Sequence, residues 1–129
     1  MRSTVRIGTL FLAAIIYLTE PTLIGSTIVE GPVVFTHDNL KMARGEPCTA
    51  VFLLEPMKGP AEEIATFHCI PIRRKVVPKF TITTQPNVAL GFGCVLTEFQ
   101  FAGDSEGHGV PNSITALASA DSSATAPEQ

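Results

Sequence analysis

Short apolar runs, interrupted by glycine and proline, are the feature that most constrains the fold of this chain. The sequence holds ten glycines and ten prolines among 129 residues. Beyond residue 26, no long stretch has apolar residues at helical spacing. The runs between the breaks are rich in β-branched and aromatic residues, which favour strands. We therefore expect an all-β fold for the body of the chain.

Five segments have the composition of strands. Residues 27–36 contain Gly31-Pro32, which predicts an edge strand or a bent one, because proline cannot donate a ladder hydrogen bond. Residues 92–101 are apolar on both faces, which suits a central strand covered on both sides. The remaining candidates are 49–54, 63–70 and 76–84. Five to six short strands predict a small β-sandwich or open barrel over residues 27–115.

The segment between the first two strands has the signals of a helix of one or two turns. Asp38 is a residue type that caps helix N-termini, and Gly45 is a type that follows helix C-termini. An irregular loop over residues 38–44 is the alternative.

The N-terminus predicts a secretory signal peptide over residues 1–26. Arg2 and Arg6 precede an uncharged, largely apolar run of 12 residues, from Ile7 to Leu18. That run is shorter than the about 20 residues of a membrane-spanning helix, and a cut after Ser26 fits the small-residue rule. The alternatives are an uncleaved anchor and a buried N-terminal helix. We expect an exported chain, periplasmic or extracellular, with no transmembrane span in its mature form.

The C-terminal end and the charge balance complete the domain outline. Residues 116–129 are small and polar, which predicts a disordered tail. The net charge of −3 gives no basic footprint for nucleic acid. The expected partner is instead another envelope or extracellular protein.

The three cysteines, Cys48, Cys69 and Cys94, favour one disulfide in an exported protein. Cys48 and Cys69 are expected on inward faces of consecutive strands, so we predict that they pair and that Cys94 stays reduced. Such a bond, closing a gap of 20 residues, stabilises by about 3 kcal/mol through chain entropy. Pairings of either residue with Cys94 remain open.

A metal centre is the sharper hypothesis for the same residue types. His37, His68 and His108, together with Cys94 or another cysteine, suit copper or zinc. Two observations count against it: no closely spaced ligand motif occurs, and adjacent His68 and Cys69 point to opposite faces of a strand. Ordinary core or surface histidines are the alternative.

The glycine-rich stretch 103–109 is the most unusual segment. Asp104, Glu106 and His108 alternate, so in an extended loop they project to one side and can bind a small cation or polar ligand. Arg73 and Arg74 are the candidate cations to neutralise them. If these arginines do not reach the loop, we expect the carboxylates to raise the pKa of His108. A plain surface loop is the alternative.

The sequence thus predicts an exported, non-catalytic β-domain with a structural or binding role and no cofactor. The first alternative is an exported copper- or zinc-binding protein that uses histidine and cysteine. The second is a small hydrolase that uses the 103–109 loop. Converging histidines and reduced thiols favour the metal alternative, whereas a disulfide and scattered histidines favour the binding role.

Overall fold

A computed structural model describes residues 2–7, 11–55 and 57–112 of the chain. The described chain is predominantly β, which confirms the all-β class. The predicted tail at 116–129 lies outside the described residues. In chain order the elements are β1 (Arg2–Ile7), β2 (Phe11–Ile24), β3 (Thr27–Asp38), α1 (Asn39–Ala43), β4 (Thr49–Glu55), β5 (Gly59–Phe67), β6 (Ile70–Arg73), β7 (Thr81–Pro86), β8 (Cys94–Gln100) and β9 (Glu106–Gly109).

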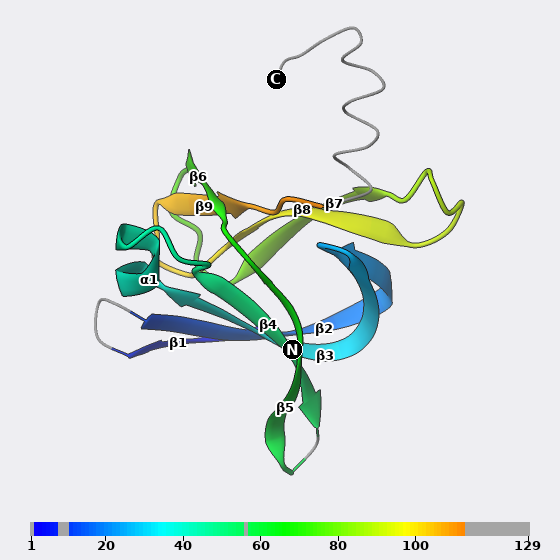
Figure 1. Ribbon diagram of the computed structural model, residues 1–129, viewed down its shortest axis with the longest axis horizontal. Coiled ribbons are helices and arrows are strands. Elements are labelled where there is room, and N and C mark those ends of the chain that lie inside the picture. The colour runs from blue at the N-terminus through cyan, green and yellow to red at the C-terminus, as the bar shows by residue number, and fades with distance from the viewer. Residues whose placement is uncertain (1, 8–10, 56, 113–129) are drawn as a thin grey trace, which may run out of the picture.

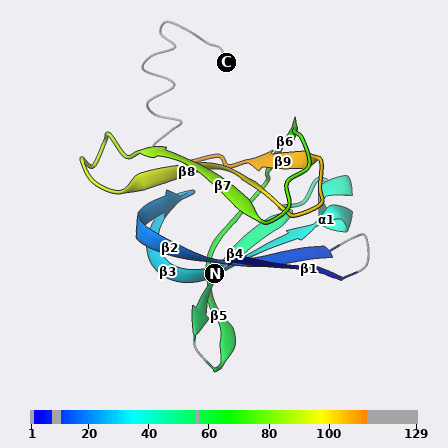
Figure 2. The same ribbon diagram turned by 180° about the vertical axis from the view of Figure 1, so that it is seen from behind.

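The nine strands of the described residues all belong to one mixed, open sheet. Its main path runs β5-β4-β3-β2-β8-β9-β6, with β1 added on β2 and β7 added on β8. Every pairing is antiparallel except that of β2 with β8. The sheet is bent so that β1–β5 lie below and β6–β9 above, and the ends of β2 and β3 curl up toward β8 (Figures 1 and 2).

The predicted count of five to six strands is wrong, for three reasons. Residues 2–7 and 11–24 form the strands β1 and β2, and the glycine-rich stretch supplies β9. The predicted strand 63–70 is divided at His68 and Cys69 into the end of β5 and the start of β6. The strand expected at 92–101 is central, as predicted, because β8 pairs with β2, β7 and β9.

The bend in the β2–β3 hairpin occurs at the predicted proline. The β2–β3 register is continuous to Leu18 and Gly31 and resumes at Thr22 and Val29. Gly31 has a φ of 98°, which favours glycine. Pro32 pairs with β2 but lies beyond the last β4 partner, so its missing N–H leaves no ladder bond unmade on that side. The bent-strand alternative is therefore confirmed.

Four phenylalanines form the centre of the core. Phe35, Phe80, Phe99 and Phe101 are at most 1% exposed. Their ring centroids lie 5.1 to 6.2 Å apart in tilted and edge-on arrangements. Such aromatic contacts add about 0.5–1.5 kcal/mol per pair beyond area burial. They join β3, in the lower part of the sheet, to β8, in the upper part.

The segment assigned from sequence to the signal peptide supplies a large part of this core. Strand β2 buries six apolar side chains: Leu12, Ala14, Ile16, Leu18, Leu23 and Ile24. It also links β3 to β8 within the sheet path. Export stays a prediction, and a chain cleaved after Ser26 lacks this strand. No helix in the described part of the chain is long and apolar enough to cross a membrane.

Gly93 provides a test of the contact between β2 and β8. A Cβ at Gly93 overlaps the carbonyl oxygen of Pro21, whereas a Cβ at Gly91 meets no atom within 4 Å. Both glycines have positive φ, 73° and 79°. We expect Gly91→Ala to lower the free energy of unfolding by about 1 kcal/mol, through backbone strain alone. Gly93→Ala is expected to lose about 1–3 kcal/mol more, because it also overpacks this junction. Urea unfolding of both variants measures the difference, and equal losses contradict the position of β2.

Candidate metal centre

Four buried side chains from four different segments converge at the end of the molecule that carries α1. They are His37 at 1% exposure, Cys48 at 4%, Cys69 at 8% and His108 at 0%. His37 belongs to β3, and Cys48 directly precedes β4. Cys69 lies in the link between β5 and β6, and His108 belongs to β9. The cluster therefore connects both parts of the folded sheet.

The helix α1 brings His37 and Cys48 together. Asp38 caps it, because its side chain accepts hydrogen bonds from the N–H groups of Leu40 and Lys41, and Gly45 follows it with a φ of 74°. The predicted cap and C-terminal glycine are thus confirmed. The chain then returns so that the Asp38 N–H donates to the Cys48 carbonyl over 2.9 Å.

The β6–β9 register brings the other pair to the same place. Pro71 of β6 pairs with His108 of β9, so Cys69, two residues before Pro71, lies diagonally across from His108. Phe67 and Cys69 are buried while His68 between them is exposed. The period of two therefore continues through the link and turns the Cys69 thiol inward.

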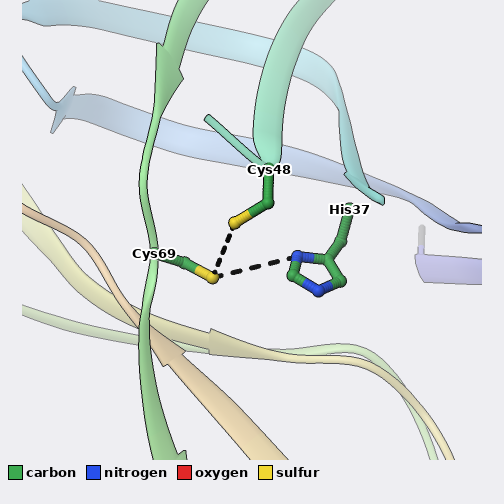
Figure 3. Close-up of side chains that lie close together, drawn as sticks. All are labelled: His37, Cys48 and Cys69. Atoms are coloured by element: carbon green, nitrogen blue, oxygen red, sulfur yellow. Dashed lines mark hydrogen bonds between the residues drawn. The ribbon is translucent and has the colours of Figure 1, made fainter. Parts of the chain in front are cut away.

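Cys69 lies at the centre of the cluster. Its Sγ lies 3.1 Å from Cys48 Sγ, 3.4 Å from His108 Nδ1 and 3.9 Å from His37 Nδ1. Figure 3 shows the two thiols and the His37 ring facing one another. The two imidazole rings are themselves close, with centroids 4.4 Å apart. Cys69 is thus within reach of three different ligand atoms.

These separations resemble those between ligands of a tetrahedral ion. With Zn–S near 2.3 Å and Zn–N near 2.0–2.1 Å, two sulfurs are about 3.8 Å apart and a sulfur and a nitrogen about 3.6 Å. The three distances at Cys69 span 3.1 to 3.9 Å. The three ligand atoms around Cys69 are thus close to tetrahedral separations, but the ligand atoms of all four residues do not yet lie within 4.8 Å of one another, so a Cys₂His₂ sphere also requires side-chain rotation that brings the others together.

Asn39 fixes the tautomer of His37. His37 Nε2 lies 2.8 Å from Asn39 Oδ1. An amide oxygen only accepts, so Nε2 carries the ring proton and Nδ1 presents its lone pair toward Cys69. This is the outer hydrogen bond that metal-ligating histidines make. Asn39 was not singled out from sequence, although its position two residues after His37 is a signal that could have found it.

Burial sets the protonation of the other two groups. Burial, and then the neighbouring His37, lower the pKa of His108 to about 4. Burial, and then the neighbouring Cys48, raise the pKa of Cys69 to about 12. At neutral pH His108 is therefore a neutral imidazole, the form that binds metals. Its Nε2 is buried and has no hydrogen-bond partner among the residues that the structure describes.

The predicted rise in the pKa of His108 is wrong in direction. Asp104 and Glu98 do favour the protonated ring, but these contributions are smaller than those of burial and His37. Sequence spacing identified nearby carboxylates but not the depth of the ring. Full burial penalises the charged form more than partly solvated carboxylates stabilise it.

The acidic stretch does not form the predicted three-residue ligand site. Glu106 and His108 share a face of β9, with Oε1 3.9 Å from Nδ1. Asp104 instead closes a local turn, because its Oδ1 accepts the Glu106 N–H. The expectation of a loop holds for the residues before β9 and is wrong for 106–109.

The two arginines do not neutralise this stretch through ion pairs. Arg74 forms a bidentate pair with Glu98 of β8, at 2.8 and 2.7 Å, and lowers the pKa of that carboxyl. Arg73 pairs with Glu106 in the β6–β9 ladder. Arg73 and Glu106 also line an open surface pocket of about 300 Å³.

The metal set predicted from sequence is corrected in part. His37 and His108 belong to the cluster, but His68 faces away and is exposed. Cys94 is buried at the β2–β8 junction, 3.3 Å from Thr22 Oγ1. Within the described chain, ligand atoms come within 4.8 Å of one another in two sets of three: His37, Cys48 and Cys69, and His37, Glu106 and His108. Neither set contains His68 or Cys94.

The predicted disulfide remains a prediction. Cys48 and Cys69 are neighbours, as that prediction requires, but both are free thiols in the structure, as is Cys94. The sequence favours a disulfide for Cys48 and Cys69, and the metal alternative names Cys94 while leaving another cysteine open.

Comparison with protein-family models, curated proteins and solved structures finds no match, so the functional argument rests on the site itself.

Proposed function

We propose that this chain is a non-catalytic β-domain that binds one Zn²⁺ ion through His37, Cys48, Cys69 and His108. One observation carries the proposal: Cys69 Sγ lies 3.1 to 3.9 Å from a ligand atom of each of the other three residues. Thiolate and imidazole are the ligands that structural zinc sites use.

The polar atoms of the cluster have few other partners. Thiols are weak donors and acceptors, and His108 Nε2 is buried without a partner among the described residues. An unsatisfied buried polar group destabilises a fold by about 1–3 kcal/mol. Phe99 and Phe101 lie against His108, with ring centroids 5.1 and 5.9 Å away, so the surroundings are apolar. An ion bound at His108 Nδ1 and at both sulfurs offsets the burial of those three atoms, whereas His108 Nε2, the other ring nitrogen, is not satisfied by it.

Charge balance favours zinc over Cu⁺. Two thiolates and two neutral imidazoles form a neutral complex with Zn²⁺ and a singly negative one with Cu⁺. Cys48, Cys69 and the two histidines are all buried, and an unpaired charge in such an interior is strongly unfavourable. Copper, the other metal expected from sequence, serves as the competing ion in the test below.

The role that fits this site is structural rather than catalytic. Four protein ligands fill a tetrahedral ion and leave no position for substrate or water, which is the pattern of structural sites. The ion joins the β3–β4 side of the fold to the β6–β9 side. For a core of this size, such a crosslink adds binding free energy directly to folding.

Cobalt binding by reduced full-length variants tests the proposal. We expect one Co²⁺ per chain, with the absorption of a tetrahedral thiolate complex, and stoichiometric displacement by Zn²⁺. Loss of an outer-shell partner alone weakens metal binding 10–100-fold, so Cys48→Ser and Cys69→Ser are expected to weaken it by more than about 100-fold.

Two residues outside the cluster provide matched controls. Cys94→Ser removes a buried thiol, and His68→Gln removes an exposed imidazole; both variants are expected to bind within about threefold of the wild type, because neither residue is a proposed ligand. Circular dichroism checks that each variant is folded. Equal weakening by Cys94→Ser, or displacement of the bound Co²⁺ by Cu⁺ but not by Zn²⁺, contradicts the assignment.

A further inference from the structure

We infer that Cys48 and Cys69 also form a redox gate: oxidation of the two thiols to one disulfide releases the zinc ion. The inference rests on the proposed zinc site and adds its regulation. Its basis is that two of the four ligand atoms are mutually adjacent sulfurs, 3.1 Å apart, on segments with 20 residues between them in sequence.

The two states exclude one another chemically. Zinc binds cysteine as the thiolate, and a sulfur in a disulfide no longer carries that charge. Oxidation removes two of the four ligands and leaves only His37 and His108. Two imidazoles do not complete the four-coordinate sphere of a structural site. The disulfide form is therefore expected to bind zinc at least about 100-fold more weakly, since loss of outer-shell contacts alone reaches that size.

The oxidant is a small-molecule disulfide, R–S–S–R. One zinc-bound thiolate attacks it, forms a mixed disulfide and expels one R–S⁻. The second thiolate then attacks the cysteine sulfur of that mixed disulfide, forms the Cys48–Cys69 bond and expels the second R–S⁻. One S–S bond is made and one is broken. Two electrons pass from the protein thiolates to the oxidant, and Zn²⁺ leaves with its charge balanced by two R–S⁻.

The link that carries Cys69 provides the route for this exchange. The β4–β5 ladder ends at Phe67, and the β6–β9 ladder begins at Ile70, so His68 and Cys69 make no ladder pair. The two residues that flank Cys69, His68 and Ile70, are both exposed. A local displacement of this link exposes the thiol without breaking either ladder. The residual exposure of Cys69, 8%, predicts slow exchange that is limited by this opening.

The redox gate connects two predictions from the sequence, a metal site and a Cys48–Cys69 disulfide. In a reducing compartment the glutathione pool keeps thiols reduced, and the zinc form is favoured. In an oxidising compartment, such as the one an exported chain enters, the disulfide form is favoured. The same pair of cysteines thus supplies either a metal crosslink or a covalent one.

The experiment uses the reduced, zinc-loaded, full-length chain. One sample receives oxidised glutathione, and the matched sample receives reduced glutathione at the same thiol-equivalent concentration. A chromophoric chelator reports released zinc, thiol counting reports oxidation, and peptide mapping without reduction locates the bond. With oxidised glutathione we expect bound zinc to fall from about one per chain to below about 0.1, given the 100-fold weakening above. Two thiols are lost for each zinc released, Cys48 is found linked to Cys69, and a dithiol reductant restores binding.

The control variant and the remaining outcomes distinguish failure of the redox gate from failure of the zinc site itself. Cys94→Ser is expected to behave as the wild type, because Cys94 lies at the β2–β8 junction. Zinc that stays bound in oxidised glutathione, or that leaves while Cys48 and Cys69 carry separate glutathione adducts, overturns the gate alone. Failure of the reduced chain to bind zinc overturns the proposed function and zinc release with it.

Discussion

A chain shortened to begin at Thr27 is expected to lose its cooperative fold. The deletion removes β1 and β2, and β2 alone buries six apolar side chains. Full burial of an aliphatic side chain such as leucine or isoleucine stabilises by about 1.5–3 kcal/mol, so the five larger side chains together contribute about 10 kcal/mol. A whole domain is stable by about 5–15 kcal/mol. Urea unfolding monitored by circular dichroism measures the loss.

A chain that begins at Phe11 is the matched control. It lacks β1, which pairs only with β2, and keeps every strand of the main sheet path. We expect it to unfold cooperatively. A cooperative transition in the Thr27 chain contradicts the position of β2 in the fold and supports cleavage after Ser26.

Acid is expected to destabilise the metal-free protein between pH 6.5 and pH 4. The pKa of His108 is about 4 in the folded chain, against 6.5 for an ordinary histidine. The unfolded chain therefore binds more protons in this window, so folding stability falls as pH falls. The contribution of neutral His108 to the free energy of unfolding is complete above pH 6.5. The loss of this contribution by pH 4 lowers the free energy of unfolding by about 3 kcal/mol.

His108→Phe keeps an aromatic ring next to Phe99 and removes the titration. We expect it to flatten the pH dependence in this window, whereas His68→Phe, at an exposed site on the opposite face, leaves the dependence unchanged. Thermal unfolding in the presence of a chelator at pH 4, 5, 6 and 7 compares the three proteins. Equal slopes for the wild type and His108→Phe contradict the buried, neutral imidazole.

Local signals in the sequence were sufficient for elements that depend on a few neighbouring residues. Asp38 and Gly45 identified α1, because a cap and a positive-φ glycine act within one turn. Gly31-Pro32 identified the bend of β3 for the same reason. The apolar run at 92–101 identified β8 as a strand covered on both faces.

The N-terminal strand could not be identified in the same way. A short apolar run after two arginines has the composition of both a signal peptide and a buried strand. What makes residues 11–24 a strand is long-range pairing with β3 and with residues 94–95 of β8. Local composition holds no information about such partners.

The metal cluster was only half predictable for a related reason. Its four ligands lie on four separate segments, and no short-range spacing connects them. Alternation along a strand correctly separated His68 from Cys69, yet it could not show that Cys69 faces His108. That contact depends on the β6–β9 register, in which Ile70 pairs with Gly109. Because β9 was expected to be a loop, this register was not available from sequence.

The ligand set of the zinc-loaded chain tests the central claim most directly. X-ray absorption at the zinc edge on the reduced, full-length protein measures the number, type and distance of the bound atoms. We predict two sulfurs at about 2.3 Å and two imidazole nitrogens at about 2.0–2.1 Å. The Cys94→Ser variant is expected to give the same spectrum. A shell of only nitrogen and oxygen ligands, or of a single sulfur, contradicts a site built from His37, Cys48, Cys69 and His108.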